Sequence, residues 1–86
     1  MAIVTVRYWA AAKQAAGIAE ETLPAGTLAE ALATVLTRHG ENPDLKAVLA
    51  RSSFLVDGER AGGNGHEGVI LQEGAIIEVL PPFAGG

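Results

Sequence analysis

The sequence predicts an α+β fold in which a mixed sheet of four or five strands packs against one main amphipathic helix. Apolar residues recur at helical spacing over residues 27–40, which predicts the helix. Apolar and β-branched residues alternate over residues 2–9 and 75–80, which predicts the first and last strands. Strand and helix patterns interleave along a chain of 86 residues, which is the length of one domain.

The first strand is predicted over residues 2–9, AIVTVRYW, where β-branched and aromatic side chains predominate. Successive side chains of a strand point to opposite faces of the sheet. One face carries Val4, Val6 and Tyr8, and the other carries Ile3, Thr5, Arg7 and Trp9. The uniformly apolar first face is therefore expected to join the core, and the mixed second face to be partly open.

Two short elements are predicted next. Residues 10–17, AAAKQAAG, combine strong helix formers with a closing glycine, which predicts a short helix. Residues 20–23, EETL, favour a short strand that we expect Pro24 and Gly26 to end. Adjacent residues of a strand face opposite ways, so Glu20 and Glu21 do not converge on one site and are interpreted as solvated.

The main helix is predicted over residues 27–40, TLAEALATVLTRHG. Thr27 and Glu30 have the spacing of a capping box, in which each side chain bonds a free backbone amide at the helix start. Arg38 and His39 fall in the last turn, where a positive charge interacts favourably with the helix dipole. The apolar face of this helix consists of Leu28, Ala31, Leu32, Val35 and Leu36.

The second half of the chain predicts a short helix, a hairpin and a final strand. Asn42 and Pro43 have the residue types of a helix start, so a helix is expected over residues 42–50. Asp57-Gly58 predicts a tight hairpin over residues 54–61. The first and last strands are expected to be adjacent, and the predicted core consists of Val4, Val6, Leu32, Val35, Leu36, Ile77 and Val79.

Composition and charge exclude several classes of function. The net charge is −4 and the basic residues are scattered, so nucleic acid is not expected as a direct partner. No apolar run approaches the ~20 residues that span a bilayer, and the N-terminus lacks a signal-peptide pattern. We therefore expect a cytoplasmic protein with no membrane partner. There is no cysteine, and His39 and His66 lack the spacing of metal ligands, so no metal is expected.

Two candidate motifs carry little weight. The segment GNGHEG, residues 63–68, matches G-x-G-x-x-G, but it is followed by VIL where a phosphate-binding motif needs a helix. We interpret residues 62–68 as a glycine-rich loop. Ser52 and Ser53 lack the G-x-S-x-G setting of a serine nucleophile. The side-chain patterns therefore predict no self-contained active site.

Trp9 has two interpretations. An aromatic side chain of this size is often buried in a core. The phase of the strand instead places Trp9 on the outer face, with Ile76 and Leu80 as possible neighbours. An apolar cluster on the outer face of a sheet indicates a partner surface. We therefore expect Trp9 and Leu80 to lie at the centre of a protein interface, with Lys13 near its edge.

The chain ends in a predicted extended tail, residues 81–86, that follows a domain of residues 1–80. The tail consists of Pro81, Pro82, Phe83, Ala84, Gly85 and Gly86. Two prolines favour a stiff extended backbone, and two glycines let a backbone enter a narrow slot. A tail of this length reaches about 20 Å, so it predicts a carboxylate presented to another protein's active site, although a frayed end is the ordinary alternative.

The chain resembles the β-grasp, ubiquitin-like sulfur carriers of the MoaD/ThiS family. The residues that carry the resemblance are VRYWAAAKQAAG (6–17), TLAEALATVL (27–36), FLVDGER (54–60) and EGAIIEVLPPFAGG (73–86). Within that family the chain is most similar to the small subunits of molybdopterin synthase. Together, and in this order, these segments extend over nearly the whole chain.

The resemblance implies that the Gly86 carboxylate is adenylated and then converted to a thiocarboxylate, which donates sulfur in molybdenum cofactor synthesis. The implied partners are a molybdopterin synthase large subunit (MoaE-like), a ubiquitin-activating-like adenylyltransferase (MoeB-like) and a sulfurtransferase. The chain is then a carrier and not an enzyme by itself. It holds no permanent cofactor, and ATP is used by the activating enzyme.

Two alternatives stay open at the level of the sequence. The first is a carrier for thiamin or cysteine synthesis, or a ubiquitin-like protein modifier, because these share the chemistry of the tail. The second belongs to another class: a β-grasp binding module whose Gly85-Gly86 end has no chemical role.

Overall fold

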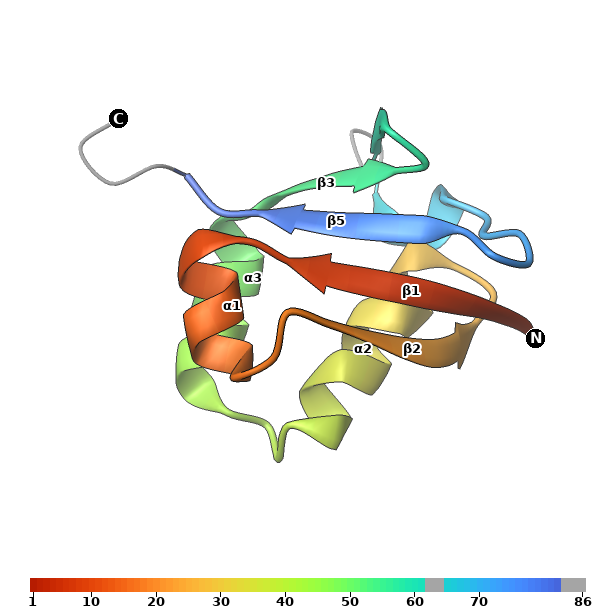
Figure 1. The fold of residues 1–86 in the computed structure, drawn as a ribbon. Coiled ribbons are helices and arrows are strands. Elements are labelled where there is room, and N and C mark those ends of the chain that lie inside the picture. Colours follow the sequence, from red (N-terminus) through yellow and green to blue (C-terminus); the bar gives the residue numbers. More distant parts are fainter. Residues whose placement is uncertain (62–64, 83–86) are drawn as a thin grey trace.

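The computed structural model describes residues 1–61 and 65–82, and it has an α+β architecture (Figure 1). The elements in chain order are β1 (Ala2–Tyr8), α1 (Ala10–Ala16), β2 (Glu20–Ala25), α2 (Leu28–Arg38), α3 (Pro43–Arg51), β3 (Ser53–Val56), β4 (Glu59–Ala61), the 3₁₀ turn η1 (His66–Gly68) and β5 (Ile76–Leu80). The strands form one sheet in the order β2-β1-β5-β3-β4. The predicted fold class is confirmed, with five strands in the sheet.

The first and last strands lie at the centre of the sheet and run parallel, as the sequence predicts. Their register runs from Thr5 opposite Ile76 to Tyr8 opposite Val79, and the other strand pairs are antiparallel. In Figure 1, α2 and α3 lie behind the sheet, and α1 packs beside α3. The helices therefore cover one face, which we call the inner face, and the opposite face is called the outer face.

Most of the predicted core is confirmed. Val4, Val6, Val35, Ile77 and Val79 are buried in one cluster between the sheet and the helices. Leu32 and Leu36 are only partly buried and pack against the edge of this cluster. The prediction that these two leucines are core residues is therefore wrong. The apolar face of α2 is rotated, so that the fully buried positions are Leu28, Ala31 and Val35.

Strand β2 is longer than predicted, because Pro24 does not end it. The strand continues to Ala25, with Pro24 opposite Ile3 of β1. Proline cannot donate a ladder hydrogen bond and is tolerated at the edge of a sheet. Since β2 is an edge strand that pairs only with β1, its other side needs no donor at Pro24.

The predicted helix start and hairpin turn are present. The Thr27 hydroxyl accepts a hydrogen bond from the Glu30 amide at 3.1 Å, and the Glu30 carboxylate accepts one from the Thr27 amide at 3.1 Å. Asp57 and Gly58 both have positive φ, 52° and 85°, as a two-residue hairpin turn requires. No helix among the described residues is long and apolar enough to cross a membrane.

Candidate partner-docking site beside the tail

The parallel pairing of β1 and β5 brings two distant parts of the chain to one edge of the sheet. Strands that run parallel end at the same edge, so the residues after Tyr8 and after Val79 emerge side by side. The Trp9 amide continues this ladder by donating to the Val79 carbonyl at 3.3 Å. Figure 1 shows the chain leaving β5 at the same end of the sheet at which β1 leads into α1.

Trp9 lies exposed at this edge. Its backbone is extended (φ −116°, ψ 149°), which continues the alternation of β1 and directs the indole to the outer face. The side chain is 48% exposed, so the prediction that Trp9 is not a core residue is confirmed. The next residue, Ala10, has φ 50°, so the chain turns sharply into α1 immediately after the tryptophan.

The other residues predicted to lie at the interface or beside Trp9 differ in how close they are to Trp9. Lys13 is exposed on α1 and lines a shallow hollow of about 290 Å³ together with Trp9, Arg7 and Glu20. Leu80 is half-buried at the end of β5, one step beyond the Tyr8–Val79 pair. Ile76 lies opposite Thr5 at the other end of β5, so the prediction that it neighbours Trp9 is wrong.

A charged row crosses the outer face next to this site. Arg7 lies opposite Glu20 of β2 on one side and opposite Glu78 of β5 on the other. Its Nε lies 3.4 Å from the Glu20 carboxylate, and both side chains are about half exposed. This contact is an ion pair without hydrogen-bond geometry, since the Nε atom has no hydrogen-bond partner among the described residues. Water screens such a pair, so it contributes little to stability.

Sequence reasoning missed a polar cluster on the inner face, centred on Glu21. Its carboxylate accepts a hydrogen bond from the Tyr8 hydroxyl at 2.5 Å and lies 2.7 Å from His39 Nε2. Arg38 adds an ion pair at 3.5 Å and donates to the Thr22 carbonyl at 2.8 Å. The Glu21 side chain is only 12% exposed. The prediction that Glu20 and Glu21 point to opposite faces is confirmed, and the interpretation of Glu21 as merely solvated is wrong.

This cluster shifts the protonation of its members. Burial acts to raise the pKa of the Glu21 carboxyl, but the Tyr8 and His39 hydrogen bonds and the charges of His39 and Arg38 outweigh it and lower the pKa. Burial is the main cause that raises the pKa of the Tyr8 hydroxyl far above its ordinary value, and the hydrogen bond to Glu21 raises this pKa further. His39 lies at the end of α2, as expected. Its ring also forms a hydrogen bond with the Glu21 carboxylate of β2. The cluster ties α2 to β2.

The remaining candidates form no catalytic group. No cluster of three or more potential ligands that could hold a metal ion occurs in residues 1–61 and 65–82. The Ser52 hydroxyl donates to the Val48 carbonyl at the end of α3, which is a structural contact. In the G-x-G-x-x-G segment, residues 62–64 lie outside the described residues, and Gly68 ends a single 3₁₀ turn that leads into an extended residue, Val69. A phosphate-binding helix start is therefore lacking after Gly68.

The tail is described only at its root. Pro81 is buried and Pro82 is exposed, so the chain leaves the domain immediately after the outer-face edge that carries Trp9 and Leu80. Phe83, Ala84, Gly85 and Gly86 lie outside the described residues. The predicted boundary between a domain of residues 1–80 and a tail of residues 81–86 stays a prediction, as do the roles of all these residues.

A five-stranded mixed sheet with β1 and β5 parallel at its centre, wrapped on α2, is a β-grasp, and the chain is therefore a ubiquitin-like protein. More particularly, it belongs to the ThiS family, whose model matches residues 6–86. The predicted membership of the MoaD/ThiS carriers is thus confirmed, and the fold is that of ubiquitin-like sulfur carriers.

Solved structures agree with this assignment. The small archaeal modifier protein 1 of Methanosarcina acetivorans is 26% identical, with a TM-score of 0.80 and coverage of 100% of this chain and 98% of that one. Subunit 1 in a complex of subunits 1 and 2 of the molybdopterin-converting factor of Helicobacter pylori is 25% identical, with a TM-score of 0.69 and coverage of 98% and 99%. A putative molybdopterin-converting factor subunit 1 of Pyrococcus furiosus, 24% identical, shares the fold with a TM-score of 0.74 and coverage of 96% and 100%. Among curated protein sequences, none matches this chain.

Proposed function

We propose that this chain is a sulfur carrier that serves as the small subunit of a molybdopterin synthase, with the carboxylate of Gly86 as its reactive group. The observation that carries the proposal is the parallel pairing of β1 and β5, which places exposed Trp9 beside the root of the tail. A partner that covers Trp9 and Leu80 is thereby in position to receive the six residues that follow. Docking and tail insertion become one event.

The proposed chemistry solves a leaving-group problem. A carboxylate is a poor acyl donor, so an activating enzyme first joins the Gly86 carboxylate to AMP and releases pyrophosphate from ATP. A sulfurtransferase persulfide then attacks the acyl carbon and displaces AMP, which leaves an acyl disulfide. A second thiol cleaves that disulfide and frees the thiocarboxylate. This chain supplies the acyl group alone, and the catalytic side chains belong to its partners.

Three partners follow from this chemistry: a MoaE-like large subunit, a MoeB-like adenylyltransferase and a sulfurtransferase. The Helicobacter pylori structure holds subunit 1 in a protein–protein complex with subunit 2, which supports the first of these. We assign Trp9 and Leu80 to the centre of the large-subunit interface and Lys13 to its edge. An indole that is half exposed beside a half-buried leucine has the character of an interface anchor.

A second candidate function has its own support. The Methanosarcina acetivorans relative is a small archaeal modifier protein and matches this chain over its whole length. In a modifier, the activated Gly86 carbonyl is attacked by a lysine amine of a target protein, which forms an isopeptide bond in place of a thiocarboxylate. The first step is shared, so only the acceptor distinguishes the two functions.

The proposal is tested by the intact mass of the chain after incubation with a MoeB-like enzyme, ATP and a persulfide donor. We expect a mass gain equal to the exchange of one oxygen for one sulfur. Deletion of Gly86 should abolish this gain, because misplacing a reacting atom by about 1 Å already costs ~10²-fold in rate. Gly68→Ala is the matched control, since a Cβ at Gly68 meets no atom within 4 Å. This control should load normally.

Each outcome selects one function. Absence of both a sulfur gain and attachment to protein lysines in the unmodified chain leaves the binding-module function. Normal sulfur loading of the Gly86-deleted chain would show that Gly86 is not the reactive group. Attachment to protein lysines without sulfur gain favours the modifier. Thermal unfolding of both variants is the accompanying measurement, and we expect the melting temperature of each to stay close to that of the unmodified chain.

A further inference from the structure

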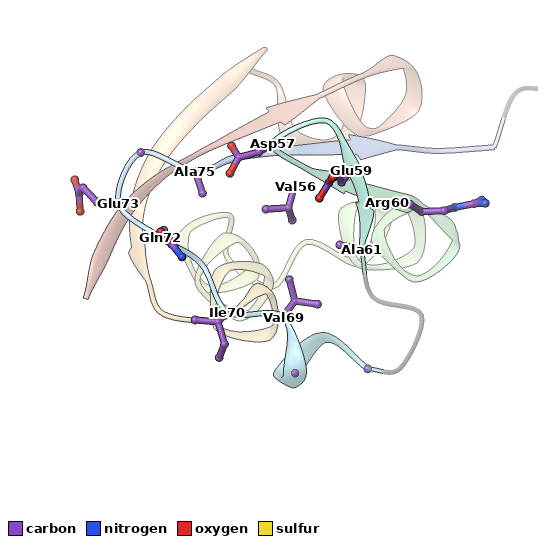
Figure 2. A pocket seen from close by; sticks show the side chains of 13 residues that line it. Val56, Asp57, Glu59, Arg60, Ala61, Val69, Ile70, Gln72, Glu73 and Ala75 are labelled. Atoms are coloured by element: carbon purple, nitrogen blue, oxygen red, sulfur yellow. The ribbon is translucent and has the colours of Figure 1, made fainter.

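A hollow of about 620 Å³ lies at the end of the sheet opposite the tail, between the β3–β4 hairpin and residues 65–75. Figure 2 shows Val56 of the hairpin and Val69 of the facing segment pointing toward each other across this space. The hollow borders the start of β5 at Ala75, whereas the tail leaves the end of β5 at Leu80. The length of β5 separates the two sites, about 17 Å at the rise of a strand.

The register of the hairpin explains why the hollow is both apolar and acidic. Phe54 is buried on the inner face, and it lies opposite Ala61, while Val56 lies opposite Glu59. Paired residues share a face and alternate residues do so too, so Val56, Ala61 and Glu59 all project from the inner face. A carboxylate on the helix-facing side of a sheet departs from the usual pattern. Glu59 is exposed there and lines the hollow.

The charge around the hollow is one-sided. Three carboxylates line it, from Asp57, Glu59 and Glu73, against one cation, Arg60. Arg60 lies opposite Leu55 on the outer face, and Figure 2 shows its side chain extending away from the hollow, as the side chain of Glu73 does. Arg60 therefore does not neutralise the other two carboxylates, those of Asp57 and Glu59.

The three carboxylates differ in what they already bond. Asp57 accepts a hydrogen bond from the Ile76 amide, and Glu73 accepts one from the Ile3 amide, each at 2.9 Å. Each holds a turn in place and retains a second oxygen for another donor. Glu59 has no hydrogen bond or ion pair with any of the described residues. With respect to the described residues, Glu59 keeps its full hydrogen-bonding capacity.

We infer that this hollow binds a short basic and apolar peptide segment of a protein partner, with a lysine or arginine ammonium or guanidinium at Glu59. Long basic side chains lay an apolar stem on an apolar surface and keep a charged head at a polar group. Val56, Val69 and Ala75 supply the apolar surface and Glu59 supplies the polar group. Ile70, 70% exposed at the rim, provides an apolar contact for the neighbouring residue of the segment.

This surface is distinct from the proposed tail chemistry, and the inference does not depend on sulfur loading. Because the hollow and the tail root lie at opposite ends of β5, one partner can hold the tail while a basic segment of the same or another partner occupies the hollow. The structure therefore assigns the chain two docking surfaces. One is centred on Trp9, and the other is centred on Glu59.

The test is a titration of the ¹⁵N-labelled chain, followed by amide chemical shifts, with two acetylated and amidated pentapeptides. One peptide alternates leucine with lysine, and the other alternates leucine with glutamate. We expect the lysine peptide to shift the amides of Val56–Ala61 and Gly65–Ala75, with a weaker effect as salt is raised from about 0.05 M to about 0.5 M. The glutamate peptide should leave these amides unshifted.

Charge-removing variants locate the interaction. The triple variant Asp57→Asn, Glu59→Gln, Glu73→Gln keeps an acceptor oxygen at each position, so the turn hydrogen bonds are preserved while three charges are lost. The triple variant should weaken binding of the lysine peptide roughly tenfold, because each contact between a carboxylate and a lysine of the peptide is partly exposed and contributes at most a few-fold. Glu59→Gln alone should weaken it a few-fold and serves if the triple variant does not fold. Glu41→Gln, which removes one exposed charge between α2 and α3, is the matched control and should bind as the unmodified chain does.

Several outcomes would overturn the inference. Shifts spread over the acidic surface, or an equal loss of affinity in Glu41→Gln, show nonspecific attraction to a chain of net charge −4. Equal binding of the two peptides removes the role of the carboxylates. Shifts of the same amides on concentrating the chain without peptide assign the hollow to a second copy. Sulfur loading of the triple variant is expected to be normal, so a failed peptide titration leaves the carrier function untouched.

Discussion

Glu20 and Glu21 are neighbours in β2, yet the two carboxylates have opposite surroundings. Glu20 projects from the outer face, where its contact with Arg7 is half exposed and lacks hydrogen-bond geometry. Glu21 projects from the inner face, where Tyr8, His39 and Arg38 all converge on it. One step along a strand separates a solvated ion pair from a network that joins α2 to the sheet.

This difference extends to the two faces as wholes. The inner face carries the buried apolar core, which determines stability, and it is bordered by the Glu21 cluster on edge strand β2 and by the Glu59 hollow on edge strand β4. The outer face carries Trp9 and Ile3, each nearly half exposed, and a charged row in which Arg7 lies between Glu20 and Glu78. Its residues are free to be covered by a partner. Substitutions on the two faces should therefore separate folding from binding.

The largest effect on folding is expected from Leu28→Ala at the start of α2. Leu28 is 0% exposed within the core, and removal of a buried leucine side chain costs ~2–5 kcal/mol. Ile3→Ala on the outer face should cost less than about 1 kcal/mol, the span of strand propensities. Leu32→Ala should fall between them, since Leu32 is partly buried. Urea unfolding of the three variants measures this order, and equal costs for Leu28 and Ile3 would contradict the division into two faces.

The next effect compares the two carboxylates directly. Glu21→Ala leaves the Tyr8 hydroxyl without its acceptor in a site of low exposure, which should cost about 1–3 kcal/mol. Glu20→Ala should cost less than about 1 kcal/mol, as expected for an exposed ion pair. The measurement is the free energy of unfolding in urea. Adding Tyr8→Phe to Glu21→Ala should recover part of the loss, because the unpaired hydroxyl is then removed. Absence of any recovery would show that this hydrogen bond is not the source of the cost.

Alternation and capping signals make most of this fold predictable from sequence. The phase of β1 places Val4, Val6 and Trp9 on their observed faces, and Thr27 with Glu30 marks the start of α2. These features depend on residues close together in the chain. The prediction that Pro24 ends the strand is wrong because a proline is tolerated in an edge strand, and whether β2 is an edge strand is a property of the whole sheet.

The Glu21 cluster was missed for a similar reason, although a signal existed. Leu23 is buried, and alternation along β2 places Glu21 on the same face, which indicates a carboxylate that faces the core. Its partners come from α2 and β1, 18 and 13 residues away in sequence. Only the packing of α2 on β2 brings them together. The hollow around Glu59 likewise depends on where residues 65–75 cross the hairpin, which no local pattern specifies.

A smaller effect is expected in the dependence of stability on pH. The folded state lowers the pKa of Glu21 below its ordinary value of 4.5, so the stabilisation is present above that value and is lost as pH falls through the folded-state pKa. The unmodified chain should therefore lose stability on acidification below about pH 5. Glu21→Gln should flatten this part of the profile, and Glu20→Gln should leave it unchanged. Equal slopes in the two variants would assign the acid sensitivity to other carboxylates.

The smallest effect on folding, and the one that most sharpens the comparison, is expected from Trp9→Ala. The indole is 48% exposed on the outer face, so its loss should change the free energy of unfolding by no more than about 1 kcal/mol. Truncation of an aromatic anchor at the centre of an interface typically costs 2 kcal/mol or more, so binding to a molybdopterin synthase large subunit should weaken by roughly 30-fold. Ile3→Ala removes an apolar side chain of nearly equal exposure, 47%, at the far end of β1 and is the matched control. Titration calorimetry with the large subunit measures both variants. If Ile3→Ala weakens this complex as much as Trp9→Ala does, the large subunit does not dock at the edge of the sheet beside the tail.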